Sequence, residues 1–68
     1  MEIRFAKILK ELMLTKGLNQ QQLSAILGVR QSQISNWLNE KSLPGYYSIR
    51  MICEKLDVSA DYLLELEE

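Results

Sequence analysis

Two short amphipathic segments joined by only three residues constrain the fold of this chain more than any other feature of its sequence. The apolar residues recur at helical spacing, as Leu23, Ile26 and Leu27 in the first segment and Ile34, Trp37 and Leu38 in the second. The joining residues Gly28-Val29-Arg30 leave no room for antiparallel packing, and a glycine suits a tight turn. The spacing predicts a helix-turn-helix over about residues 20–39, whose second helix spans roughly Gln31 to Asn39.

Helical periodicity continues through the rest of the chain. Three further apolar patterns carry Phe5, Ile8, Leu9 and Leu12, then Tyr46, Ile49, Ile52, Cys53 and Leu56, and finally Leu63, Leu64 and Leu66. Gly17 suits a left-handed helix end, Asn19 with Gln22 a capping box, and Ser59 an N-cap with Asp61 in the first turn after it. Pro44 marks where a new helix begins. No alternating β pattern occurs, so the sequence predicts one all-α domain over residues 1–68, a compact five-helix bundle.

Composition excludes several classes of protein. A chain of 68 residues has the size of one small domain, and it has no apolar run of the ~20 residues that span a bilayer. The charged N-terminus lacks the apolar stretch of a signal peptide. The lone Cys53 has no partner for an internal disulfide, so we interpret it as a small buried apolar residue. We therefore expect a cytoplasmic location, near the nucleoid.

Charge is distributed unevenly along the chain. Residues 1–50 carry seven Lys and Arg against three acidic residues, a net charge of +4, whereas residues 51–68 carry one against six, a net charge of −5. Such a molecule would face a polyanion with its first fifty residues. Chance clustering on solvated faces is the alternative explanation.

The predicted helix from Gln31 has an unusual polar face. Opposite its apolar stripe lie short neutral side chains that form hydrogen bonds, namely Ser32, Ser35, Asn36 and Asn39, with Arg30 and Gln31 at the leading end. An ordinary solvated face is rich in Glu and Lys, whereas Gln and Asn can form two hydrogen bonds with adenine and Ser can donate or accept. This pattern favours contact with DNA bases over an idle exposed face. Flanking phosphates would be contacted by Asn19, Gln20, Arg30, Gln33, Asn39 and Lys41.

The sequence resembles the Cro and phage-repressor-like (XRE) helix-turn-helix family over nearly its whole length. The resemblance is carried by the runs at 16–20 (KGLNQ), 28–37 (GVRQSQISNW), 41–44 (KSLP) and 56–64 (LDVSADYLL). It implies a five-helix fold in a prokaryotic or phage context. It also implies base contacts from Gln31, Ser32, Ser35 and Asn36, with Gln20 bracing Gln31 and touching phosphate.

Three positions depart from the family pattern. Arg30 stands where a small hydroxylated residue is common, which removes an N-cap and offers a phosphate or guanine contact. Ser24 stands where alanine is usual, a small change that fits close helix packing. Met13 and Leu38 stand where the family often pairs an arginine with a glutamate, and an apolar replacement of a buried ion pair can be neutral or stabilising.

Two other classes of function compete with DNA binding. An enzyme is disfavoured because the chain has no His, a Cys without a nearby base, and no phosphate loop or metal spacing; we expect no catalytic residue, metal, cofactor or small-molecule ligand. A protein-interaction module, antitoxin-like or adaptor, would instead use the acidic, leucine-rich end from Asp61 to Glu68. We expect a transcriptional regulator, a repressor, whose partners are double-stranded DNA with a near-palindromic operator and a second copy of the chain.

Overall fold

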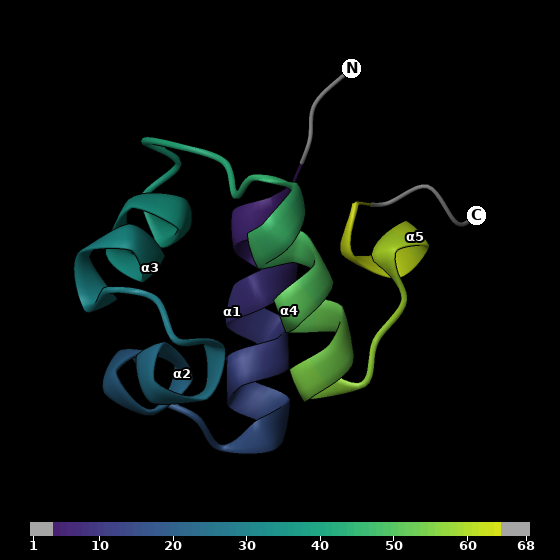
Figure 1. Cartoon of the computed structure of the whole chain (residues 1–68), viewed down its shortest axis with the longest axis horizontal. Coiled ribbons are helices and arrows are strands. Elements are labelled where there is room, and N and C mark those ends of the chain that lie inside the picture. Colours follow the sequence, from purple (N-terminus) through teal and green to yellow (C-terminus); the bar gives the residue numbers. More distant parts are fainter. Residues whose placement is uncertain (1–3, 65–68) are drawn as a thin grey trace.

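The computed structural model describes residues 4–64, which form five α-helices joined by short loops (Figure 1). The helices are α1 (Phe5–Lys16), α2 (Gln20–Leu27), α3 (Gln31–Leu38), α4 (Tyr46–Leu56) and α5 (Ala60–Leu63). No strand occurs between residues 4 and 64, so the predicted all-α fold with five helices is confirmed. None of these helices is long and apolar enough to cross a membrane.

The ends of α1 and α2 and the starts of α2 and α5 lie where the sequence predicts them, whereas α4 begins at Tyr46, two residues after Pro44. Gly17 and Gly28 adopt left-handed backbone angles, with φ of 65° and 69°, and end α1 and α2. The Asn19 side chain accepts a hydrogen bond from the Gln22 backbone N–H at 2.8 Å, and the Gln22 side chain accepts one from the Asn19 N–H at 2.9 Å. This reciprocal pair is the predicted capping box. At the start of α5, the Ser59 hydroxyl accepts a hydrogen bond from the Tyr62 N–H, as predicted.

The core draws one completely buried apolar residue from every helix. These residues, each with 0% of its surface exposed, are Leu9, Leu23, Ile34, Ile52 and Leu63. In the ribbon view, α2 and α3 lie on one side of α1 and α4, and α5 lies on the other (Figure 1). Helix α1 contacts α3 and α5, whereas α4 contacts α2 and α5. The core therefore ties the two helices of the helix-turn-helix to the rest of the bundle.

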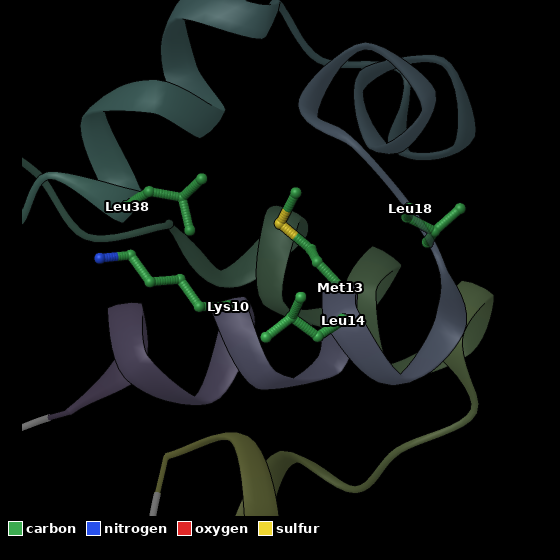
Figure 2. Close-up of a pocket in the computed structure, with 5 residues that line it drawn as sticks. All are labelled: Lys10, Met13, Leu14, Leu18 and Leu38. Carbon is green, nitrogen blue, oxygen red and sulfur yellow. The ribbon is translucent and has the colours of Figure 1, made fainter.

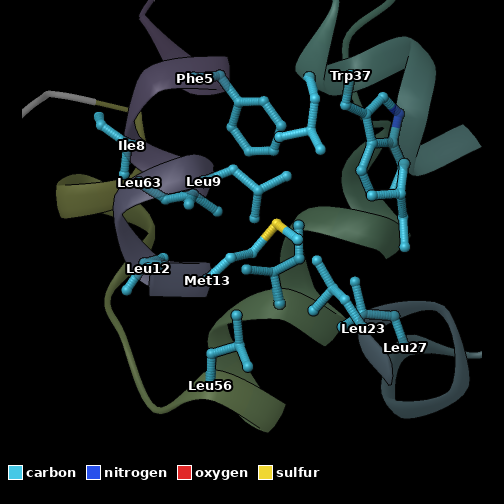
Figure 3. Packing of buried hydrophobic residues seen from close by; sticks show 13 residues of the cluster. Phe5, Ile8, Leu9, Leu12, Met13, Leu23, Leu27, Trp37, Leu56 and Leu63 are labelled. Carbon is cyan, nitrogen blue, oxygen red and sulfur yellow. The ribbon is translucent and has the colours of Figure 1, made fainter. Parts of the chain in front are cut away.

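Aromatic packing fixes α3 against the first turn of α1. The rings of Phe5 and Trp37 meet edge to face, with centroids 6.2 Å apart and an interplanar angle of 80°. This arrangement is favourable for aromatic quadrupoles, and both rings lie within the buried cluster (Figure 3). Trp37 is thus a core residue, as the sequence predicted.

Some predicted buried positions are exposed instead. Ile26 is 38% exposed, because the eight-residue α2 buries only Leu23 and Leu27. Tyr46, which the apolar pattern of residues 46–56 predicted to face inward, is 79% exposed, and the adjacent Tyr47 is 69% exposed. They form the first turn of α4, which begins at Tyr46 after Gly45 as N-cap, and the buried residues of that helix lie further along it.

The remaining apolar positions divide between partial burial and the core. Cys53 is half-buried rather than buried, and its desolvation raises the pKa of the thiol. Leu63 is buried, Leu64 is half-buried, and Leu66 lies outside the described residues.

Exchanging Ile52 for a smaller residue should measure how tightly the core is packed. Ile52→Val removes one buried methyl group from a fully enclosed site, and we expect a loss of about 1 kcal/mol in the free energy of unfolding. The same exchange at the partly exposed Ile26 should cost less than half as much. Urea denaturation of both variants checks this, and equal losses would contradict the assigned packing of α2 and α4.

Candidate nucleic-acid interface

The turn between α2 and α3 is fixed by hydrogen bonds to one residue of α2. The Ser24 hydroxyl donates to the Val29 carbonyl oxygen at 2.6 Å. The Ser24 carbonyl accepts from the backbone N–H groups of Gly28 and Val29, at 2.9 and 3.3 Å. Sequence reasoning treated Ser24 only as a small residue for close packing and missed this bond. The bond restrains the direction in which the chain enters α3.

At the start of α3, only one of the two hydrogen bonds of a capping box is formed. The Gln33 side-chain oxygen accepts a hydrogen bond from the Arg30 backbone N–H at 3.1 Å. The Arg30 side chain makes no capping hydrogen bond, since a guanidinium has donors but no acceptor. The expected loss of an N-cap at Arg30 is therefore confirmed. Its exposed guanidinium stands beside the N-terminus of α3, while the oxygen of Gln33 is already engaged.

Helix α3 separates an apolar inner side from a polar outer side. Its inner side buries Ile34, Trp37 and Leu38. On the outer side Gln31, Ser32, Gln33 and Asn36 are exposed, Ser35 is half-buried, and Asn39 is exposed just beyond the helix. No acidic or basic residue occurs from Gln31 to Asn39. The structure thus presents the four predicted base-contacting side chains along one short helix, with Ser35 the least accessible.

Ser35 and Asn39, two of the predicted DNA-contacting residues, are hydrogen-bonded to each other. The Asn39 side-chain amide donates to the Ser35 hydroxyl oxygen at 3.3 Å. Asn39 also ends α3, where its backbone N–H donates to the Ser35 carbonyl at 2.9 Å. Because its side chain is hydrogen-bonded to Ser35, Asn39 has less freedom to reach a phosphate. The same hydrogen bond allows Asn39 to position the Ser35 hydroxyl.

At the start of α2, the predicted phosphate contacts have different surroundings. The side-chain oxygen of Asn19 is occupied by capping, which leaves only its amide N–H groups to donate. Gln20 is half-buried as the first residue of the helix. Between residues 4 and 64 no hydrogen bond joins Gln20 to Gln31, so the bracing contact stays a prediction.

The cations near α3 and α4 also differ. The Lys41 backbone N–H donates to the Asn36 carbonyl at 2.9 Å, which holds the exposed Lys41 next to the end of α3. Arg50 on α4 is bound to Glu54 at 3.0 Å, and this hydrogen bond raises the pKa of the guanidinium. Of these two cations, Lys41 lies next to α3, whereas Arg50 is engaged by Glu54.

Nothing in the described part of the chain resembles a metal centre. Over residues 4–64 no group of three or more His, Cys, Asp or Glu side chains lies close enough together to hold an ion. The polar residues of α3 and its flanks are the candidate site.

Comparison with known proteins supports a helix-turn-helix domain over most of the chain. A helix-turn-helix family model, HTH_3, matches residues 9–63. A crystal structure of a transcriptional regulator from Listeria innocua superimposes with a TM-score of 0.89 at 19% sequence identity, which shows a common fold. The match covers 100% of this chain and 64% of that one. No curated protein matches the sequence.

Alanine substitution should distinguish a structural asparagine from an exposed one. Asn19→Ala removes the side-chain cap of α2, and we expect a loss of about 1 kcal/mol in the free energy of unfolding. Asn36→Ala, in the exposed middle of α3, should cause no loss, because alanine is the better helix former. Thermal unfolding of both variants gives the comparison. A comparable loss for Asn36→Ala would mean that this residue supports the fold.

Proposed function

We propose that this chain, which belongs to the Cro/C1-type helix-turn-helix family HTH_3, is a sequence-specific double-stranded DNA-binding transcriptional regulator, acting as a repressor. Helix α3 enters the major groove and contacts base edges with its exposed side. The observation that carries this proposal is the uncharged outer side of α3, which holds only side chains that form hydrogen bonds.

Base contacts are assigned to Gln31, Ser32, Ser35 and Asn36. Gln31 and Asn36 have the side-chain amides that form paired hydrogen bonds with adenine N6 and N7. Both are exposed, and no hydrogen bond within residues 4–64 occupies either side chain. They are the strongest candidates for sequence recognition.

Phosphate contacts are assigned chiefly to Arg30, Lys41 and Gln20. Arg30 and Lys41 flank α3 at its two ends and carry the positive charge that α3 itself lacks. Gln20 begins α2, where backbone N–H groups favour an anion. Asn19 and Gln33 contribute less, because the side-chain oxygen of each is used in capping.

Ser35 is assigned the role of a hydrogen-bond donor. Because its oxygen accepts from Asn39, its hydroxyl hydrogen is left to donate. In the major groove a donor suits purine N7, guanine O6 or thymine O4 rather than the cytosine amino group. Asn39 thus becomes a positioning residue for Ser35, in place of a phosphate contact.

Two copies of the chain are proposed to bind one operator. A module of this size buries a modest area on DNA, and two half-sites about one helical turn apart would supply useful affinity. The operator is therefore expected to be near-palindromic, and the regulator to act as a homodimer in the cytoplasm, close to the nucleoid.

The burial of one leucine weakens the case for the alternative function, a protein-interaction module that uses the acidic end of the chain. Leu63, one of the leucines at that end, is completely buried in the core. It is not available to a partner in the folded domain, whereas the outer side of α3 is exposed.

Selection from random duplexes tests the proposed function directly. Purified protein is incubated with a pool of random double-stranded DNA over several rounds, first at low and then at moderate salt. Enrichment of a short, near-symmetric sequence is the expected result, and sedimentation should then find two protein chains per duplex. Weak, salt-sensitive retention without enrichment would favour the docking function, and a single chain per duplex would disprove the dimer.

Substitutions at Gln31 and Lys41 should have different effects on binding. Gln31→Ala should weaken binding to the selected sequence by about 1–3 kcal/mol and hardly change binding to random DNA. Lys41→Ala should weaken both alike and reduce the salt dependence by about one counterion. Titrations at several salt concentrations distinguish them, and equal patterns for the two variants would show the roles to be wrong.

The role of Asn39 is tested by comparing it with Ser35. Ser35→Ala and Asn39→Ala should relax preference at the same base pair, because Asn39 acts through the Ser35 hydroxyl. The double variant should then be no worse than Ser35→Ala alone, since coupled residues are not additive. Binding profiles over all single-base variants of the selected site give the answer. A uniform loss for Asn39→Ala across all sequences would instead support the original phosphate contact.

A further inference from the structure

An apolar pocket opens on the molecule beside the end of α3. Its volume is about 290 Å³, and its walls come from α1, the α1–α2 loop and the last residue of α3. The lining residues are Lys10, Met13, Leu14, Leu18 and Leu38. Figure 2 shows Met13 between Leu38 on one side and Leu18 on the other, with Lys10 and Leu14 along the edge formed by α1. None of these residues belongs to the proposed DNA-contacting set.

Met13 and Leu38 contribute apolar side chains to the pocket lining, and each is only 8% exposed. Apolar side chains that border water leave a surface that gains from apolar contact. Leu14, at the rim, is 82% exposed. The site therefore presents an apolar hollow with a further apolar side chain at its edge.

One charge marks the edge of this hollow. Lys10 is the only charged residue among those that line the pocket, and its stem lies along the pocket edge toward Leu38 in Figure 2. Within residues 4–64 its ammonium group forms no ion pair. An exposed lysine commonly lays its methylene groups on apolar surface and keeps its charge in water. A ligand that suits both features has an apolar body and one negatively charged end.

We propose that the pocket binds a small amphiphilic carboxylate, with its alkyl chain against Met13, Leu18 and Leu38 and its carboxylate beside Lys10. The volume, about 290 Å³, lies just below the range of small-molecule sites, about 300–1,000 Å³, so the ligand is no longer than a medium-length chain. Sequence analysis expected no such ligand, because the five lining residues come together only in the folded chain. The carboxylate site uses none of the residues proposed to contact DNA, although Leu38 is the last residue of α3.

Methionine-methyl NMR provides a test with an internal control. The chain has three methionines, Met1, Met13 and Met51. Of the two within the described residues, only Met13 lines the pocket, whereas Met51 lies on α4. Titration with sodium octanoate below its micelle concentration should shift the Met13 methyl signal saturably and leave that of Met51 unchanged. Octan-1-ol, which has the same chain and no charge, should produce the Met13 shift with lower affinity.

A matched pair of lysine variants tests the role of the charge. Lys10→Gln should reduce octanoate affinity by about two- to five-fold, the range for an exposed ion pair, and leave octan-1-ol affinity unchanged. Lys7→Gln, one turn earlier on α1 and outside the pocket, should change neither. Absence of a saturable Met13 shift, parallel shifts of Met13 and Met51, or equal effects of the two variants would each overturn the proposal. These readouts contain no DNA, so they are independent of the proposed regulator function.

Discussion

The structure depends on one hydrophobic constraint, that every helix must bury one side in a core that a chain of 68 residues can only just assemble. Each of the five helices contributes a completely buried residue, from Leu9 in α1 to Leu63 in α5. Helix α3 buries three of its eight residues, and the edge-to-face contact of Trp37 with Phe5 holds it against α1. Because that inner side is fixed, the opposite side of α3 must face outward. The candidate site is thus a consequence of the core.

The turn between α2 and α3 restrains the orientation of α3 relative to α2. Gly28 ends α2 in a left-handed conformation, and the Ser24 hydroxyl donates a hydrogen bond to the Val29 carbonyl. These contacts restrain the angle between α2 and α3, which decides whether both can follow a DNA groove and its phosphates together. A rigid scaffold of this kind lets short side chains such as Ser32 and Asn36 act with little loss of conformational freedom.

Polar groups at the surface divide into those that support the helices and those left for a partner. The side chains of Asn19 and Gln33 accept hydrogen bonds that cap the starts of α2 and α3. The Asn39 side chain donates a hydrogen bond to Ser35. The side chains of Gln31 and Asn36 form no hydrogen bond within residues 4–64. Met13 and Leu38 have a different effect, since these two apolar side chains help to line a pocket next to the end of α3. The same helix therefore has a polar outer side for the proposed DNA contacts and an apolar end for the proposed carboxylate ligand.

Local sequence patterns were enough to predict the five helices, the helix ends at Gly17 and Gly28, the capping box at Asn19 and the inward apolar stripe of α3. These features arise from interactions between residues three or four positions apart, which the order of residues specifies directly. Packing between the helices, by contrast, leaves Ile26 and Tyr46 exposed, brings the Ser24 hydroxyl to the turn, and places Met13 and Leu38 in one pocket. Such outcomes depend on how helices are placed against one another, and periodicity within one helix does not specify that placement.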